Sequence, residues 1–267
     1  MGQRPIVTLT TDFGLSDHFV GAMKGVILSI NPEVRLVDIS HQVSSYDLLD
    51  GAITLALAYS YFPVDTIHVA VVDPGVGSAR RPIVVSTRSY KFVAPDNGVL
   101  SLVYDREKEF EARHVTAEHY FLKPVSQTFH GRDIFSPVAA WLSKGVEPDK
   151  FGEVIRDPIR FAPPKVKPLD GGRMQAAVIK VDKFGNLITN IRPADAPALF
   201  GSSPVAFRIT INQHEITQLH SSYSAGHPSQ LFAIAGSSGY LEICQNRAAA
   251  AKTLGAGRGT EVILAFS

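Results

Sequence analysis

The first 160 residues alternate short apolar runs with segments of helical periodicity. β-branched and aromatic residues gather in strand-like runs at 5–13, 34–40, 66–73 and 81–96, the last of which reads as two strands joined by a turn. Between them, residues 16–30 carry one apolar stripe at helical spacing, and residues 46–62 predict a second helix that ends before Pro63. Alternating strands and helices predict an α/β domain with a mainly parallel sheet flanked by helices.

The pattern changes at residues 160–172, where prolines and glycines cluster as in an interdomain linker. Beyond this stretch, strand-like segments follow one another with little helical periodicity. We therefore expect an α/β domain over 1–162, a proline-rich linker over 163–170, and a smaller all-β, barrel-like C-terminal domain over 171–267.

Composition and charge exclude several classes of protein. The 267 residues are 45% hydrophobic and 19% charged, with a net charge of +1, which is typical of a globular protein without general affinity for nucleic acid or acidic membranes. The apolar runs fall short of the roughly 20 residues of a membrane helix, and no signal peptide is visible. The single cysteine, Cys244, is expected to be a small buried hydrophobe. A lone cysteine favours a reducing compartment, so we expect a cytoplasmic protein.

Acidic residues stand where the first three predicted strands end. Asp12, Asp38 and Asp73 occupy these positions, and ligands of open α/β sheets bind beyond the C-terminal strand ends. Asp12 precedes a turn at Gly14, and its carboxylate can accept hydrogen bonds from sugar hydroxyls. Neither a glycine-rich dinucleotide fingerprint nor a phosphate loop is present, which favours a nucleoside without phosphates. The alternative is that Asp12 and Asp17 only cap the following helix.

The segment DPGVGSARR, residues 73–81, predicts a rigid turn. Pro74 fixes one backbone angle, while Gly75 and Gly77 permit angles that other residues resist. Such a turn returns Arg80 or Arg81 towards the strand end that carries Asp73. A carboxylate beside a guanidinium is either a structural ion pair or part of a polar site.

His130 has the most site-like setting of the nine histidines, between Phe129 and Gly131 and before a predicted helix. The alternative is a histidine with a structural role. Neither an HExxH motif nor a Cys/His cluster occurs, so we expect no metal site, and the GxSxG nucleophile motif is absent as well.

Three later segments have both a functional and a structural interpretation. Asp96 and Asn97 are turn or cap residues at 94–101. Asn186 offers an amide that suits a purine edge, or belongs to an ordinary Gly-Asn turn. The small-residue loop that opens 236–244 either approaches a ligand closely or only turns the chain.

Taken together and in order, these segments resemble one family, the S-adenosyl-L-methionine hydrolases or hydroxide adenosyltransferases. These enzymes are relatives of the adenosylmethionine-dependent fluorinases and chlorinases. The resemblance extends over nearly the whole chain and is carried by TTDFGLSDHFVGAMKG, VDISHQVSSYD, VVDPGVGSARR, FVAPDNG, TFHGRD, VDKFGNLITNI and SSGYLEI.

The resemblance implies a catalytic Asp–Arg–His triad of Asp73, Arg80 (not Arg81) and His130. The halogenating relatives carry a non-acidic residue at the first position and a small residue in place of the histidine, so this chain keeps the hydrolase pattern. The implied roles in substrate binding are ribose hydroxyls for Asp12, adenine for Asn186, the methionine portion for Asp182, aromatic walls for Tyr46 and Tyr223, and further contacts for Asp73, Phe129, Ser237 and Glu242. Ser238 stands where halogenating enzymes often carry arginine, so recognition of the amino-acid end is expected to differ.

The implied function is hydrolysis of S-adenosyl-L-methionine to adenosine and L-methionine, by in-line attack of an activated water on the ribose 5′ carbon. The resemblance further implies no cofactor, no metal, and a homotrimer with active sites between subunits. Three alternatives remain open: a halide-using adenosyltransferase, a non-catalytic adenosine- or adenosylmethionine-binding protein, and a structural two-domain protein whose acids are only caps.

Overall fold

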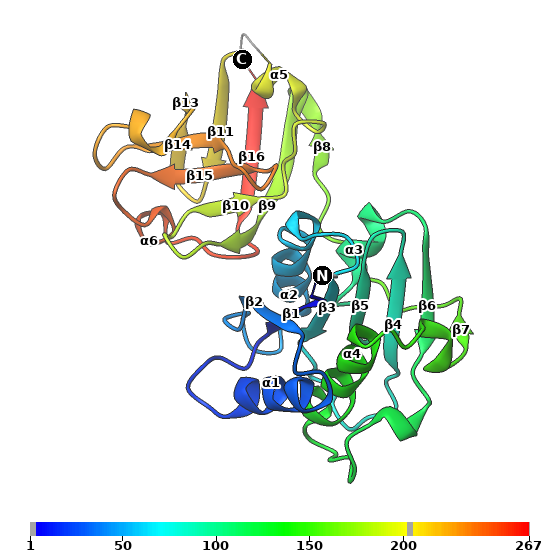
Figure 1. Cartoon of the computed structure of the whole chain (residues 1–267). Coiled ribbons are helices and arrows are strands. Elements are labelled where there is room, and N and C mark those ends of the chain that lie inside the picture. The colour runs from blue at the N-terminus through cyan, green and yellow to red at the C-terminus, as the bar shows by residue number, and fades with distance from the viewer. Residues whose placement is uncertain (1–3, 202–204, 267) are drawn as a thin grey trace. The chain divides into compact units, whose positions relative to one another are not determined.

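The computed structural model describes residues 4–201 and 205–266, which form two compact units, each with its own core. The boundary between the N-terminal and the C-terminal unit falls between Pro163 and Pro164, within the proline-rich stretch (Figure 1).

The N-terminal unit contains a seven-stranded sheet with the order β2-β1-β3-β5-β4-β6-β7 (Figure 1). Its strands are β1 (Ile6–Thr11), β2 (Arg35–Ser40), β3 (Ile67–Val71), β4 (Pro82–Thr87), β5 (Lys91–Pro95), β6 (Phe110–His114) and β7 (Val154–Ile155). The order places β1 beside β3, so that Asp12 and Asp73 follow neighbouring strands at the same edge of the sheet.

The expectation of a mainly parallel sheet is wrong, because the sheet is mixed. Strands β2, β1, β3 and β5 are parallel, whereas β4 is antiparallel to both β5 and β6, and β7 is antiparallel to β6. The reason lies in residues 82–95, where the short turn between β4 and β5 makes a hairpin, and a hairpin reverses the chain direction. The mixed half therefore begins immediately after the segment that carries Asp73 and Arg80.

Helices cover both faces of this sheet: α1 (Phe19–Ile30), α2 (Leu48–Ala56), α3 (Ser101–Arg106) and α4 (Ser136–Ser143). Strand β3 shows why both layers are needed. Val69 and Val71 belong to the core cluster shared with α1 and α4, whereas Ala70 and Val72 belong to the cluster shared with α2 and α3. Strand β3, apolar at every position except His68, is thus buried on both faces, as its sequence predicts.

The C-terminal unit is built around one nine-stranded sheet that curls (Figure 1). Its elements are β8 (Lys167–Leu169), β9 (Arg173–Val181), β10 (Leu187–Thr189), α5 (Pro197–Phe200), β11 (Phe207–Ile211), β12 (His214–Ile216), β13 (Leu219–His220), β14 (Leu231–Ala235), β15 (Leu241–Gln245), α6 (Ala250–Leu254) and β16 (Glu261–Phe266). The end strands β12 and β13 do not pair with one another within the described residues, so the curled sheet stays open there. In the described residues, the short α-helices α5 and α6 accompany the strands, and β8 lies in the stretch expected to be a linker.

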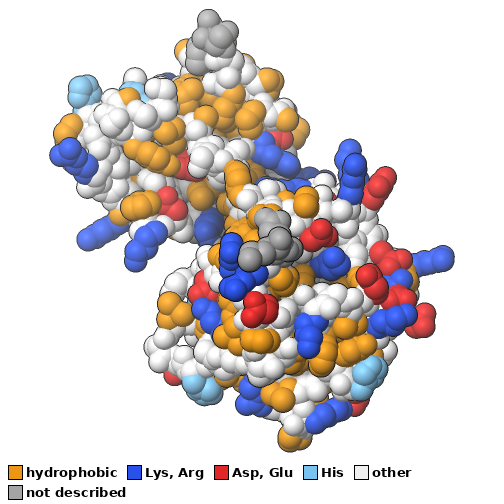
Figure 2. Space-filling view, in the orientation of Figure 1, with side chains coloured by type: hydrophobic (Ala, Val, Ile, Leu, Met, Phe, Trp, Pro, Cys, Tyr) orange, Lys and Arg blue, Asp and Glu red, His pale blue; other side chains and the backbone are white. Residues whose placement is uncertain are grey.

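The surface carries charges of both signs. Figure 2 shows acidic and basic side chains intermixed over the visible face of the N-terminal unit, in keeping with a net charge of +1. In the described part of the chain, every helix is too short or too polar to cross a membrane. Cys244 is buried beside Phe232 and Ile234, as its apolar setting predicts.

Candidate active site

Arg80 joins Asp73 and His130 into one cluster beyond the C-terminal end of β3. Its Nε lies 3.0 Å from each carboxylate oxygen of Asp73, and its Nη2 lies 2.7 Å from Nδ1 of His130. The side chains of Asp73 and Arg80 are only 4% and 8% exposed. The guanidinium carbon also lies 5.2 Å from the centre of the Phe135 ring. Charge-assisted hydrogen bonds are stronger when they are shielded from water, so these bonds fix the orientation of the Arg80 guanidinium.

Gly77 explains how the turn after β3 reaches the segment that carries His130. Its φ of +78° lies in the left-handed region, and a Cβ at this position would stand 2.4 Å from the carbonyl oxygen of Gln127. The turn therefore packs directly against the backbone three residues before His130. This close approach, which only glycine permits, brings Arg80 to the imidazole.

His130 accepts a hydrogen bond rather than donating one to this cluster. Because Nη2 of Arg80 is a donor, Nδ1 of His130 is the acceptor, and the ring proton of the neutral imidazole lies on Nε2. Burial lowers the pKa of His130 below its usual value, and the positive charge of Arg80 lowers it further. His130 is thus held neutral at neutral pH, in the form that can accept from Arg80.

Asp12 lies at the neighbouring strand end and receives the backbone N–H of Tyr46 at 2.8 Å. Burial raises the pKa of the Asp12 carboxyl. The negative charge of Asp73 raises this pKa further, because the two carboxylates repel one another. The helix-cap alternative for Asp12 and Asp17 is wrong, because α1 begins after His18 without any side-chain cap. The Tyr46 side chain is exposed, and its φ of +65° is unusual for a non-glycine residue.

Phe129 is buried, and its ring packs edge-on against Phe13 and Phe19. It therefore supports the loop around Asp12 and the start of α1 from the interior of the unit. Asp133 is also fully buried, and its Oδ2 accepts the backbone N–H of Ser126 at 2.8 Å. The Ser126 backbone in turn hydrogen-bonds His130, so Asp133 helps to fix the segment that precedes the imidazole.

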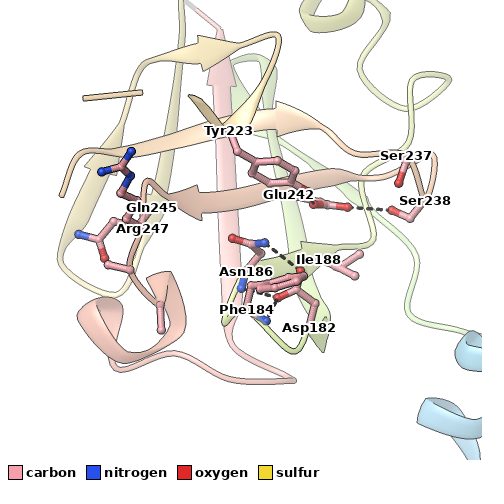
Figure 3. Close-up of a pocket in the computed structure, with 12 residues that line it drawn as sticks. Asp182, Phe184, Asn186, Ile188, Tyr223, Ser237, Ser238, Glu242, Gln245 and Arg247 are labelled. Carbon is pink, nitrogen blue, oxygen red and sulfur yellow. Dashed lines mark hydrogen bonds between the residues drawn. The ribbon is translucent and has the colours of Figure 1, made fainter. Parts of the chain in front are cut away.

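The C-terminal unit holds a cavity of about 810 Å³, a volume that suits a nucleoside-sized ligand. Figure 3 shows the side chains that line it, which come from the β9–β10 turn, the helical turn at Tyr223 and strand β15 with its flanking loops. The lining residues are Asp182, Phe184, Asn186, Ile188, Tyr223, Ser237, Ser238, Glu242, Gln245, Arg247, Ala248 and Ala249.

Asp182 fixes the orientation of the Asn186 amide in this cavity. One carboxylate oxygen of Asp182 accepts the backbone N–H groups of Phe184 and Asn186, and the other accepts from Nδ2 of Asn186, each at 2.8 Å. In the described part of the chain, the Oδ1 atom of Asn186 and its second N–H have no hydrogen-bond partner, and such an acceptor and donor pair matches a purine edge. Strands β9 and β10 thus form a hairpin whose turn is held by the Asp182 carboxylate, and the same carboxylate fixes the Asn186 amide.

Glu242 is 4% exposed and accepts two side-chain hydrogen bonds inside the cavity. They come from the hydroxyls of Tyr223, at 2.9 Å, and Ser238, at 3.1 Å (Figure 3). Burial and this bond to Glu242 raise the pKa of Tyr223. Gly236 packs on the same carboxylate so closely that any Cβ would overlap it. The small-residue loop is thus required for the close approach to Glu242.

The residues expected to bind or act on a substrate therefore gather in two places. Asp12, Tyr46, Asp73, Arg80 and His130 lie at the strand ends of the N-terminal unit, and Asp182, Asn186, Tyr223, Ser237 and Glu242 line the cavity of the C-terminal unit. Sequence reasoning missed Phe184, Gln245 and Arg247 in the cavity and Asp133 behind His130. Phe184 and Asp133 lie inside motifs that it did single out, KFGN and FHGRD. Among the described residues, no group of three or more His, Cys, Asp or Glu side chains could hold a metal ion.

Comparison with known proteins gives consistent matches over both units. The family described as SAM hydroxide adenosyltransferase matches with its N-terminal domain at residues 7–152 and its C-terminal domain at 176–263. An (R)-S-adenosyl-L-methionine hydrolase of Methanocaldococcus jannaschii is 39% identical over 70% of this chain and 67% of its own length, and one of Salinispora tropica is 35% identical over 96% and 95%.

A solved structure of an uncharacterized conserved protein from Thermotoga maritima superposes with a TM-score of 0.90 at 33% identity, covering 97% of this chain and 99% of that one. A fluorinase of an Actinoplanes species is more distant, at 28% identity over 72% of this chain and 73% of its own length.

Proposed function

The chain belongs to the SAM hydroxide adenosyltransferase family, and from that membership we propose that it hydrolyses S-adenosyl-L-methionine to adenosine and L-methionine. The observation that carries the proposal is the guanidinium of Arg80, held between Asp73 and His130 at the C-terminal edge of the sheet. The names of the hydrolase relatives specify the (R) form, and we extend the proposal to that epimer at sulfur.

The part of this reaction that needs catalysis is the activation of the nucleophile. A water oxygen forms a bond to the ribose 5′ carbon, the C5′–S bond breaks, and its electron pair leaves with the now neutral sulfur of methionine. The water loses a proton, so the nucleophile must be made hydroxide-like near neutral pH. Since an anionic nucleophile attacks a cationic sulfonium, charge is consumed and a dry site favours the reaction. The scheme uses no metal and no cofactor.

Arg80 is the group that stabilises the nucleophile. Its Nε and Nη2 are taken by Asp73 and His130, whereas Nη1 has no hydrogen-bond partner in residues 4–201 and 205–266. Its two N–H groups, on a permanently charged guanidinium, are available to an attacking water. The proton leaves to the carboxylate of Asp73, because the only lone pair of the neutral His130 ring accepts from Arg80.

We propose that the cavity of the C-terminal unit binds the adenine and methionine portions of the substrate. We assign the adenine edge to the amide of Asn186, the methionine portion to Asp182, and further contacts to Tyr223, Ser237 and Glu242. Two carboxylates in the lining suit a substrate that carries a sulfonium and an ammonium group. In the N-terminal unit, Asp12 is assigned to the ribose hydroxyls.

We further propose that the enzyme is a homotrimer in which the substrate contacts the triad of one subunit and the cavity of the next. The support is the family resemblance together with the division of substrate-binding residues between two units. Mixing an Arg80→Ala protein with an Asn186→Ala protein after subunit exchange tests this arrangement. Partial recovery of activity supports it, and a mixture as inactive as its components contradicts it.

A cytoplasmic location is part of the proposal. It is supported by the single, buried cysteine, which needs no oxidising compartment, and by the intracellular nature of the proposed substrate. Fractionation of the producing cells tests it.

The decisive experiment follows the fate of the oxygen. Purified protein is incubated with each sulfonium epimer in oxygen-18 water, with and without halide, and nucleosides are identified by chromatography and mass. Adenosine labelled at the 5′ oxygen, formed from the (R) epimer without halide, supports the proposal. A halogenated nucleoside moves the protein to the halide-using class, and bound adenosine without turnover leaves a binding protein.

A further inference from the structure

Two consecutive residues, Asp96 and Asn97, hold both ends of the loop that presents Asp73 and Arg80. They follow β5 directly and belong to neither the triad nor the cavity. The loop between Val72 and Arg81 contains only the residues 73–80, so anything that fixes its two ends fixes the geometry of the reacting pair. The inference drawn below rests on the proposed function for its catalytic part and on geometry for the rest.

Asn97 holds the end of the loop that precedes Asp73. Its Nδ2 donates to the carbonyl oxygen of Val72 at 2.9 Å, while its Oδ1 accepts the N–H of Val99 at 3.1 Å. The Val99 donor requires an oxygen and the Val72 carbonyl requires an N–H, so the amide has one consistent orientation. Helix α2 also packs closely against Val72, because a Cβ on Gly51 would stand 2.9 Å from the Val72 side chain.

Asp96 holds the end of the loop that follows Arg80. Its backbone N–H donates to the carbonyl oxygen of Arg81, and its Oδ2 accepts from the Arg81 guanidinium, each at 2.8 Å. The Oδ1 atom accepts the N–H of Ile159, also at 2.8 Å. Asp96 is 2% exposed, so this network is shielded from water. On its outer side, Arg81 makes a second ion pair with Asp157, which is largely exposed.

We propose that Asp96 and Asn97 are positioning residues for the Asp73–Arg80 pair, acting through the backbone on either side of it. The two arginines of the motif then have separate tasks. Arg80 faces the reacting water, whereas Arg81 anchors the loop to Asp96. Because a displacement of about 1 Å at a reacting group costs about 100-fold in rate, this anchoring acts on turnover rather than on substrate binding.

The test uses Asn97→Asp, which keeps the side-chain size and the acceptor for Val99 but turns an oxygen towards the Val72 carbonyl. The expected result is a kcat lowered about 10- to 100-fold with KM unchanged. In the same protein, the ¹⁵N-labelled Nε–H resonance of Arg80, assigned through Arg80→Lys, is expected to shift because its bond to Asp73 changes. Arg81→Lys keeps the charge beside Asp96 but loses the planar fork that reaches Asp96 and Asp157 together, and it is expected to change both readouts in the same direction.

Asp157→Asn is the control, because it removes only the negative charge of the exposed partner of Arg81 and is expected to leave both readouts unchanged. An Asn97→Asp protein with wild-type kcat, or with a lowered kcat and an unmoved Arg80 resonance, overturns the proposal. If the wild-type protein forms no adenosine, the proposed function fails, and the resonance alone decides whether Asn97 positions Arg80.

Discussion

Arg80 and His130 lie fifty residues apart in the chain, yet Nη2 of Arg80 donates to Nδ1 of His130 over 2.7 Å. The same guanidinium nitrogen also donates to Asp73, so one charged group connects the end of β3 with the segment before α4. This arrangement makes the imidazole an acceptor whose neutrality is required. A cation on His130 would remove its lone pair and face the charge of Arg80 directly.

Replacement of Arg80 by lysine is expected to separate charge from geometry. Lysine keeps the positive charge but cannot bind Asp73 and His130 through a planar fork. We expect kcat to fall about 100- to 1,000-fold, the loss that follows removal of a preorganised stabilising donor, with adenosine affinity retained. Steady-state kinetics and calorimetry with adenosine measure the two effects. Wild-type turnover in this variant contradicts the assigned role.

The acid limb of the pH profile is expected to belong to His130. Burial and Arg80 lower its pKa, so kcat should stay level near neutral pH and fall only below 6.5, the usual histidine value. Protonation is unfavourable here because it ends the bond from Arg80. His130→Asn offers Arg80 an acceptor that does not titrate, and its profile should lack this limb. A limb above pH 6.5, or one that persists in the variant, assigns the titration elsewhere.

Local patterns predicted the strand ends of this site and not its long-range contacts. The apolar run of β3 and the acids after β1 and β3 were predictable, since burial on both faces leaves a clear signature in sequence. The direction of β4 was not predictable, because an apolar run has the same pattern in a parallel and in an antiparallel strand. The β4–β5 hairpin makes β4 antiparallel to its neighbour.

The pairing of Arg80 with His130 could not be predicted from the local sequence either. The turn alone did not distinguish Arg80 from Arg81. Family resemblance selected Arg80, and the structure shows why the two differ: Arg80 bonds Asp73, and Arg81 bonds Asp96. Asp96 and Asn97 read as turn residues in the sequence because their partners lie 15 and 25 positions away. Side chains that act across the sheet leave no periodic signal.

Gly77→Ala is expected to disturb the triad through packing and not through backbone strain alone. The new Cβ would stand 2.4 Å from the Gln127 carbonyl, so the turn must move away from the segment that carries His130. Gly145→Ala is the control, because Gly145 has a similar φ of +86° but open space around it. Both variants should lose about 1 kcal/mol of stability from the left-handed backbone, and only Gly77→Ala should lose activity. Equal activity in the two variants contradicts this account.

His68 is expected to make the N-terminal unit sensitive to acid. Its buried ring stacks on Phe92 and touches Tyr59 and Tyr90, and burial lowers its pKa to about 3. The folded state therefore keeps the ring neutral, while the unfolded state takes up a proton below about 6.5. Stability should fall as pH drops from 6.5 towards 3, by about 1.4 kcal/mol per pH unit at most.

Urea titrations between pH 7 and pH 4 measure this slope. His68→Phe fits the aromatic surroundings and does not titrate, so its stability should depend less on pH than that of the wild type. His214→Gln, at an exposed position, controls for the loss of one histidine from the unfolded chain. If His68→Phe has the wild-type slope, His68 is not the group responsible.

Asn186→Asp is expected to weaken adenosine binding without altering the triad. The exchange removes the N–H that the Asp182 carboxylate accepts and sets two carboxylates against one another in the cavity. It also removes the donor that we assign to the adenine edge. Loss of one buried hydrogen bond costs about 1–3 kcal/mol, so calorimetry should show an adenosine Kd raised about 10- to 100-fold.

Two comparisons make the result specific. Arg80→Lys should bind adenosine as the wild type does, since its change lies at the attacking water. The Arg80 Nε–H resonance should stay in place in Asn186→Asp, because the cavity residues and the triad belong to different units of the chain. An Asn186→Asp protein with unchanged adenosine affinity would move the adenine subsite away from the β9–β10 turn and leave Gln245 and Arg247, which also line the cavity, as the next residues to replace.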